Sequence, residues 1–136
     1  MQNSSEQRMR LTDEARGALF THARDGRPEE VAGVLAGPDS ETVTRVERAE
    51  NVADDPRRRY ELDPVEQAEI LDAVETRGET VVGFYHSHPR DPPVPSATDE
   101  RLATWDGYVY LIVSPDESSL AAYRWTGERF ESVRLD

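Results

Sequence analysis

The sequence contains no cysteine and no lysine, and all 16 of its basic residues are arginine. Without cysteine the chain has no disulfide, no thiolate nucleophile and no sulfur ligand, so any metal must be held by nitrogen and oxygen. Without lysine it offers no side-chain amine for conjugation. Acidic residues number 28, and the formal net charge of -12 argues against nucleic acid as a partner, because a phosphate backbone attracts clustered cations.

Long apolar runs and an export signal are missing as well. No stretch approaches the roughly 20 apolar residues of a membrane-spanning helix, so we expect no membrane association. The first ten residues are polar and lack the apolar core of a signal peptide, which predicts a cytoplasmic location. The acidic, lysine-free composition resembles that of proteins from salt-loving archaea and favours a halophilic protein.

The chain has the length of one domain. We expect a flexible lead-in over residues 1–10 and a single domain over 11–136. Apolar periodicity, caps and turn residues predict helices over 12–26, 63–78 and 96–105, and strands over 31–36, 42–48, 59–62, 80–88, 108–114, 120–125 and 129–134. Helices interspersed with strands, followed by a closing hairpin, predict an α/β fold with one mixed sheet flanked by helices.

Two of the three histidines, His86 and His88, lie one residue apart at the end of a predicted strand. Alternate residues of a strand project from the same face, so these imidazoles can share one metal ion. The proline-rich segment 89–95 is predicted to be irregular and to return the chain to the same point. Ser96 then caps a short helix, and Asp99 lies in the first turn of that helix.

Together, His86, His88 and Asp99 would give zinc three protein ligands and leave a fourth position for water, as in catalytic zinc sites. Bound zinc lowers the pKa of water and polarises a carbonyl group. Amide hydrolysis also needs a proton carrier and a donor for the developing oxyanion. Ser96 can be that donor. The best-placed carboxylate for the proton carrier is Glu30, which lies just before the predicted strand 31–36.

The pattern His86-Ser87-His88-Pro89, then Ser96 and Asp99, resembles the signature of the JAMM (MPN-plus) metalloprotease family. The segment 28–37 contains Glu30 and a Gly-x-Leu-x-Gly run that is also similar to the family. Further similarity extends over 51–56, 60–64 and 108–114, so the resemblance covers about residues 11–135. Within the family, the chain looks most like the small, single-domain haloarchaeal desampylases.

This resemblance implies a cytidine-deaminase-like fold, with a curved mixed sheet between helices in three α-β-α layers. It implies one zinc ion per chain, held by His86, His88 and Asp99, with Glu30 as general acid/base and Ser96 stabilising the tetrahedral intermediate. The implied reaction is hydrolysis, by zinc-activated water, of the isopeptide bond between the C-terminal glycine of a ubiquitin-like modifier and a substrate lysine. Such modifiers and their lysine conjugates are therefore the implied partners.

Two alternatives stay open at this point. A JAMM peptidase with the same site could instead process the C-terminus of a sulfur-carrier protein. The chain could also be a non-catalytic MPN module that binds partners, although every ligand of the motif is present. The sequence does not indicate an oligomeric state.

Other residues receive structural interpretations. His22 is interpreted as a functionless histidine on the surface of the first helix, and Trp105 and Trp125 as core residues. The arginine run 57–59 is interpreted as a solvated segment that could nevertheless contact an acidic partner.

Overall fold

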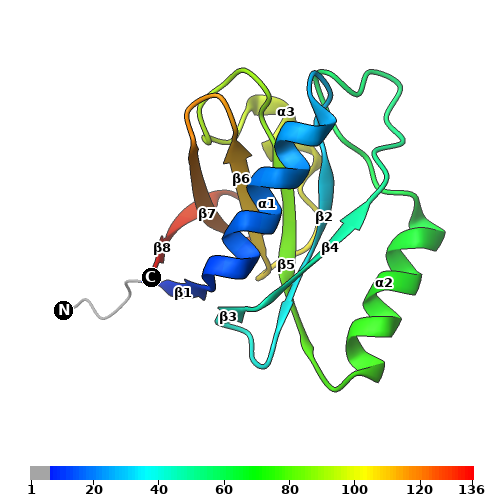
Figure 1. Ribbon diagram of the computed structural model, residues 1–136, viewed down its shortest axis with the longest axis vertical. Helices are drawn as coiled ribbons and strands as arrows, with labels where there is room; N and C mark the ends of the chain where they lie inside the picture. The colour runs from blue at the N-terminus through cyan, green and yellow to red at the C-terminus, as the bar shows by residue number, and fades with distance from the viewer. Residues whose placement is uncertain (1–6) are drawn as a thin grey trace.

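Within residues 7–136, which the computed structural model describes, eight strands pair into one mixed sheet and three helices pack around it (Figure 1). The helices are α1 (Asp13–Gly26), α2 (Pro64–Thr76) and α3 (Ala97–Leu102). The strands are β1 (Arg8–Leu11), β2 (Ala32–Gly37), β3 (Thr42–Val43), β4 (Arg45–Ala49), β5 (Thr80–Ser87), β6 (Val109–Ser114), β7 (Ser119–Trp125) and β8 (Phe130–Leu135).

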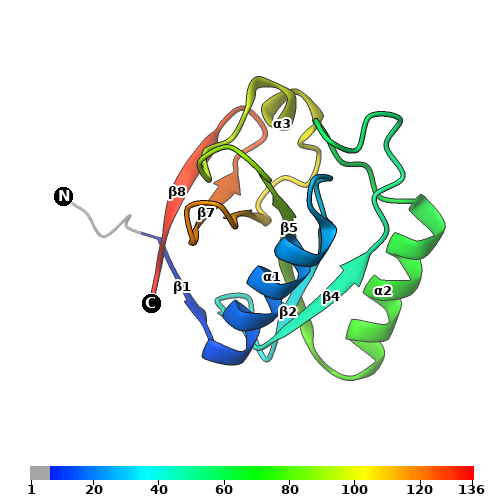
Figure 2. The same ribbon diagram turned by 45° about the horizontal axis from the view of Figure 1, so that its top comes forward.

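The sheet is strongly curved. Its strand order is β3-β1-β8-β7-β6-β5-β2-β4, yet β3 and β4, at the two ends of this order, are separated in the chain by Thr44 alone. The amide of Thr44 donates to the carbonyl oxygen of Ala36 at 3.0 Å, so the sheet curls until its ends nearly meet. Figure 2 shows α1 inside this curve and α2 outside it. The expected α/β fold with a curved mixed sheet between helices is confirmed.

Helix α1 forms because its sequence supplies a cap and one apolar face. The hydroxyl oxygen of Thr12 accepts from the amide of Ala15 at 3.2 Å, and Ala15, Leu19 and Ala23 are buried against the sheet. On the outer face, α2 packs on β2, β4 and β5. Thr12 caps α1, where the sequence allowed Thr12 or Asp13, and the predicted caps Asp63 of α2 and Ser96 of α3 are confirmed.

The interpretation of His22 as a surface residue was wrong. His22 is buried on α1, and its Nδ1 atom lies 2.7 Å from the hydroxyl of Tyr85, a fully buried residue of β5. The physical reason is the tyrosine: a phenol inside a core needs a hydrogen-bonding partner, and the histidine supplies it. Of the two tryptophans, Trp125 is buried as predicted, whereas Trp105 is half-buried.

Strand β1 is a further difference, since its first three residues fall in the expected lead-in; residues 1–6 lie outside the described part of the chain. Met9 and Leu11 alternate with exposed arginines and are buried where β1 pairs with β8 and β3. The alternation was visible in the sequence, but the pairing partner β8 is at the other end of the chain.

One predicted strand and one predicted helix end were also wrong. The segment 59–62 is no strand: Leu62 forms only an isolated bridge with Asn51, and the amide side chain of Asn51 takes the hydrogen bonds of this loop instead. Helix α3 ends at Leu102 rather than at Trp105, because the amides of Thr104 and Trp105 donate to the hydroxyl of Tyr110. Within the described residues, none of the helices is long and apolar enough to cross a membrane.

Candidate metal centre

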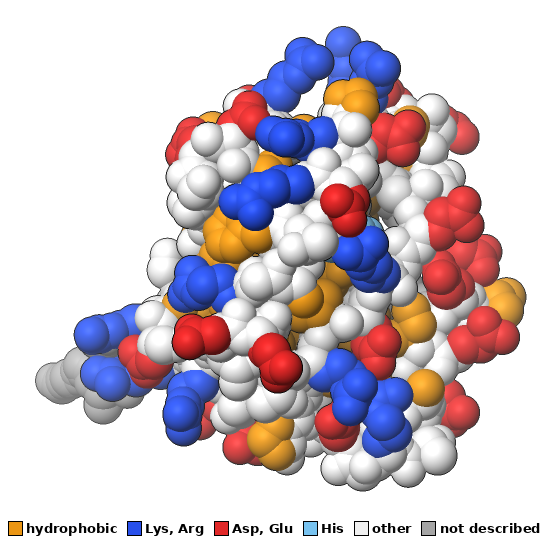
Figure 3. Space-filling view, in the orientation of Figure 1, with side chains coloured by type: hydrophobic (Ala, Val, Ile, Leu, Met, Phe, Trp, Pro, Cys, Tyr) orange, Lys and Arg blue, Asp and Glu red, His pale blue; other side chains and the backbone are white. Residues whose placement is uncertain are grey.

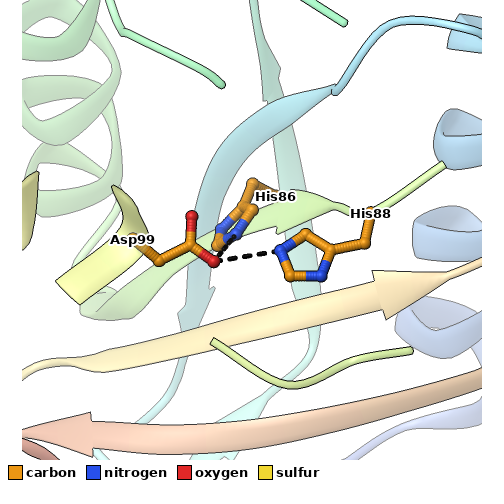
Figure 4. A group of neighbouring side chains, drawn as sticks. All are labelled: His86, His88 and Asp99. Atoms are coloured by element: carbon orange, nitrogen blue, oxygen red, sulfur yellow. Dashed lines mark hydrogen bonds and ion pairs between the residues drawn. The ribbon is translucent and has the colours of Figure 1, made fainter. Parts of the chain in front are cut away.

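The structure brings together the three predicted ligands, His86, His88 and Asp99 (Figure 4). Nε2 of His86 lies 3.1 Å, and Nε2 of His88 2.9 Å, from the same oxygen, Oδ2 of Asp99. All three side chains are buried, and their ligand atoms lie within 4.8 Å of one another. The geometry is that of side chains converging on one point.

Strand β5 fixes the two histidines. His86 lies within β5 opposite Ala32 of β2, while His88 follows the end of the strand. The amide of His88 donates to the carbonyl oxygen of Val113 at 2.8 Å, so the extended backbone continues through this residue. Because His86 and His88 are two residues apart on extended backbone, both project from the same face.

Helix α3 fixes Asp99 through a reciprocal cap. The hydroxyl oxygen of Ser96 accepts from the amide of Asp99 at 3.0 Å, and Oδ2 of Asp99 accepts from the amide of Ser96 at 3.0 Å. This capping box holds the carboxylate against the turn that it begins. The Asp99 carboxylate therefore takes part in the helix cap and in the metal centre at the same time.

The protonation states suit a metal. Nδ1 of His88 lies 2.9 Å from the carbonyl oxygen of Pro92, which can only accept, so Nδ1 carries a proton and the neutral form of the ring, which binds metals, presents its lone pair on Nε2. Nε2 of His88 and Nε2 of His86 both lie against the same carboxylate oxygen, Oδ2 of Asp99. A cation bound between these three atoms would satisfy both nitrogens and the carboxylate. Two imidazole nitrogens and one carboxylate oxygen are a donor set that fits one zinc ion.

The pKa shifts of the three ligands follow from their burial and from their close approach to one another. Burial alone would raise the pKa of Asp99, but hydrogen bonds to His86 and His88 outweigh it and hold that pKa far below its usual range. Burial lowers the pKa of His86. For His88, burial is outweighed by hydrogen bonds to Asp99 and Pro92, which raise its pKa. The carboxylate is therefore charged, and His86 is neutral, as ligands must be.

Glu30 lies beside this centre, where the register of β2 and β5 continues towards His88. Its backbone is fixed at both ends, since its amide donates to Pro56 at 2.7 Å and its carbonyl oxygen accepts from Asn51 at 2.9 Å. The residue is only 7% exposed, and Oε1 of its buried side chain has no hydrogen-bonding partner. Burial, and then the charge of Asp99, raise the pKa of Glu30 to about 8.

Sequence reasoning gave no site role to Tyr60 or to the carbonyl of Pro92. The ring of Tyr60 stacks on that of His86 at 4.4 Å between centroids and 20° between planes, which covers the ligand on one side. A single tyrosine in a polar loop carries no signal for such a contact, and a backbone carbonyl has no sequence signature at all.

Two cavities are lined by residues next to the centre, although none of the three ligands lines either cavity. One, of about 420 Å³, is lined by Tyr60 with the rings of Phe84, Trp105 and Tyr110. The other, of about 360 Å³, contains Glu30. Tyr60, which stacks on His86, therefore lines one cavity, and Glu30 lines the other.

Comparison with known proteins accounts for this arrangement. The family described as prokaryotic homologs of the JAB domain matches residues 12–126. A desampylase from Haloferax volcanii is 50% identical over 133 residues, which cover 94% of this chain and 95% of the relative. A CysO-cysteine peptidase from Mycobacterium tuberculosis is 38% identical over 79% of this chain and 75% of its own.

Among solved structures, the crystal structure of AF2198, a JAB1/MPN domain protein from Archaeoglobus fulgidus, superposes with a TM-score of 0.62. It is 21% identical, and the match covers 95% of this chain and 98% of that protein, so it supports the fold. These matches confirm the resemblance drawn from the sequence and the expectation of a metal-dependent hydrolase. The chain belongs to the JAB family, the JAMM/MPN family, as one of its prokaryotic members.

Proposed function

We propose that the protein is a zinc-dependent isopeptidase that releases ubiquitin-like modifiers from lysine side chains. The observation that carries this proposal is the convergence of His86, His88 and Asp99 on one point beside the unpartnered carboxyl group of Glu30. The similarity to the Haloferax desampylase, at half identity over nearly the whole chain, supports the choice of substrate.

In this proposal, His86, His88 and Asp99 hold one zinc ion. When bound, zinc supplies a water molecule of lowered pKa and polarises the carbonyl group of the scissile bond. Because the carboxylate of Asp99 is held by its own helix cap and His88 by Pro92, the ligands are oriented before any metal binds.

Glu30 is the proton carrier. It accepts the proton of the attacking water and delivers it to the lysine nitrogen as the C–N bond breaks, which leaves a glycine carboxylate and a lysine amine. A carrier works best when its pKa lies near the working pH, and burial has moved the pKa of Glu30 from the acidic range to about 8. The buried oxygen Oε1, which has no partner, is free to make these contacts.

Ser96 donates to the oxyanion. Its oxygen accepts from the amide of Asp99, which uses a lone pair and leaves the O–H free. A donor held in place by a helix cap is oriented before the reaction and does not have to reorganise during it.

A second candidate is a peptidase that processes the C-terminus of a sulfur-carrier protein. It is favoured by the similarity to the CysO-cysteine peptidase. Both reactions place a modifier-like tail on one side of the scissile bond, and they differ in the leaving amine. The same side chains would serve, so only the substrates distinguish the two.

The test compares two substrates: a ubiquitin-like modifier joined through its C-terminal glycine to a peptide lysine, and the same modifier with a C-terminal cysteine adduct. We expect the zinc-loaded protein to cleave the lysine conjugate and a chelator to stop cleavage. Glu30→Gln should abolish it, whereas the matched change at the exposed neighbour, Glu29→Gln, should not. Cleavage of the cysteine adduct alone would favour the second candidate.

A further inference from the structure

Three arginines line the cavity that contains Glu30: Arg57, Arg58 and Arg90. They come from two loops, one between β4 and α2 and the other after β5. Among the residues the structure describes, Glu30 and Asp91 are the two acidic residues on the wall of this cavity, against three arginines. The cavity is therefore a basic site in a protein whose net charge is -12.

These arginines are largely uncompensated. Arg57 and Arg90 form no ion pair within the described part of the chain, and Arg58 has only Asp55, at 3.6 Å, with a side chain that is 84% exposed. Some arginines elsewhere pair closely with acids, as Arg77 does with Glu47 at 2.9 Å. In Figure 3, arginine side chains project along the upper edge of the molecule, over the loops that Figure 1 shows there. Such a cluster attracts anions from solution.

The reaction determines which part of the substrate lies at this cavity. Glu30 must reach the leaving nitrogen to deliver a proton, so the leaving group departs on the side of the scissile bond where Glu30 lies. Glu30 lines the same cavity as the arginines. The residues around the conjugated lysine are therefore brought to this cavity, which shares no lining residue with the aromatic cavity beside Tyr60.

We propose that Arg57, Arg58 and Arg90 bind acidic residues that flank the conjugated lysine, so that the enzyme prefers lysines in acidic segments of its substrate proteins. The inference rests on the proposed isopeptidase function. Guanidinium groups suit this task because their planar fork matches a carboxylate with two parallel hydrogen bonds. Nucleic acid would also meet three arginines, but the acidic remainder of the surface repels it.

The kinetic test uses one ubiquitin-like modifier joined to the lysine of two peptides of equal length. One peptide has Asp and Glu around the lysine, and the other has Asn and Gln at the same positions. Exposed ion pairs are individually weak, so we expect three of them to give about a tenfold higher kcat/KM for the acidic conjugate. In the variant Arg57→Glu/Arg90→Glu the ratio should fall to about one or below.

A matched control carries the same change of charge elsewhere. Arg16→Glu/Arg129→Glu alters an exposed residue of α1 and one of the β7–β8 turn, outside both cavities, and should retain the preference. Raising the salt concentration should reduce the preference of the unmodified protein, because these charges are exposed. Equal rates on both conjugates, or a preference that survives Arg57→Glu/Arg90→Glu, would overturn the inference.

A binding measurement separates this inference from the proposed function. The fluorescein-labelled acidic peptide, without modifier, should bind the zinc-loaded protein more tightly than the amide peptide, and Arg57→Glu/Arg90→Glu should remove the difference. Equal binding of a single-stranded oligonucleotide would overturn the assignment to acidic protein segments. Failure to cleave either conjugate counts against the isopeptidase itself, whereas equal cleavage of both counts only against the acidic preference.

Discussion

The hydroxyl group of Tyr85 lies 2.7 Å from Nδ1 of His22, so strand β5 is hydrogen-bonded to helix α1 inside the core. Tyr85 directly precedes His86, and neighbouring residues of a strand project from opposite faces. Each is buried on its own face of the sheet. The strand that carries the metal-centre histidines is therefore held from the opposite face by α1, and the hydrogen bond is a part of the support of the site.

Removing one partner of this hydrogen bond should cost more than removing both. His22→Leu leaves the Tyr85 hydroxyl buried and unsatisfied, which we expect to lower the free energy of unfolding by about 1–3 kcal/mol. His22→Leu/Tyr85→Phe removes both polar groups and should recover part of this loss. Denaturant unfolding of the two single variants and the double variant measures the coupling. Strictly additive losses would show that the two groups do not interact.

The position of the Tyr85 side chain also requires a glycine at position 33. A Cβ atom at Gly33 would collide with the ring and hydroxyl of Tyr85 and with the carbonyl oxygen of Glu47. We therefore expect Gly33→Ala to destabilise the protein by about 2–3 kcal/mol. Gly17, within α1, has no atom within 4 Å of the corresponding position, so Gly17→Ala should stabilise it by about 0.5–1 kcal/mol. Thermal unfolding of the two variants should show shifts of opposite sign.

Local patterns in the sequence were sufficient for much of the site. The spacing of His86 and His88 on a strand predicts their common face, and the Ser96 to Asp99 spacing predicts the cap that the structure shows. These features depend on residues a few positions apart, whose geometry follows from the period of a strand or the first turn of a helix. Glu30 was selected by its place just before the predicted strand 31–36, and the sequence resemblance supported this choice among its acidic neighbours.

The features that the sequence did not predict depend on distant partners. His22 is buried because Tyr85, 63 residues away, needs a partner for its hydroxyl. Strand β1 forms because β8 and β3 lie on either side of it. Asn51 replaces a strand pairing with side-chain hydrogen bonds to its own loop. In each case tertiary contacts decide the outcome, and periodicity within one segment contains no information about them.

Asp99→Asn should remove most of the zinc affinity while preserving the fold. The amide keeps the size of the side chain and an oxygen for the Ser96 amide, but it loses the charge that faces both histidines. At a zinc concentration 100 times the Kd of the unmodified protein for zinc, this protein should gain about 2.7 kcal/mol of stability. If the variant binds 100-fold more weakly, its gain at the same zinc concentration is about 0.4 kcal/mol.

The control for this prediction is Glu100→Gln, an exposed neighbour on α3. It should retain the full stabilisation by zinc in thermal unfolding and the full metal content. An Asp99→Asn protein that still binds zinc as tightly as the unmodified protein would remove Asp99 from the set of ligands.

The buried carboxyl group of Glu30 should make the metal-free protein less stable as the pH rises. Its pKa is about 8 in the folded state and about 4.5 in the unfolded chain, so between these values the folded state binds the additional proton. The contribution of Glu30 is fully present below pH 4.5 and is lost as the pH passes through about 8. At pH 8 the loss is on the order of a few kcal/mol.

Glu30→Gln makes this loss measurable, since the amide resembles the protonated acid and does not titrate. With chelator present, the variant should become progressively more stable than the unmodified protein between pH 5 and pH 8. Glu29→Gln, at an exposed position, should show no such trend. A constant difference across this pH range would mean that Glu30 titrates at an ordinary pKa.

Ser96 combines a helix cap with the proposed donor to the oxyanion, and three substitutions separate these tasks. Ser96→Ala removes both and should cost about 1 kcal/mol of stability and about 10²–10³ in kcat. Ser96→Gly should cost only a few tenths of a kcal/mol, because glycine is a tolerable cap, yet it should lose as much activity as Ser96→Ala. Ser96→Thr keeps the hydroxyl and should keep most of both.

Metal content must be measured beside the rates, because a loosened cap would also release Asp99, whose carboxylate accepts from the Ser96 amide. If Ser96→Gly binds zinc normally and has lost its activity, the missing group is the hydroxyl rather than the ligand geometry. If activity instead follows stability across the three variants, Ser96 acts through the position of Asp99 alone, and the oxyanion must be stabilised by another donor.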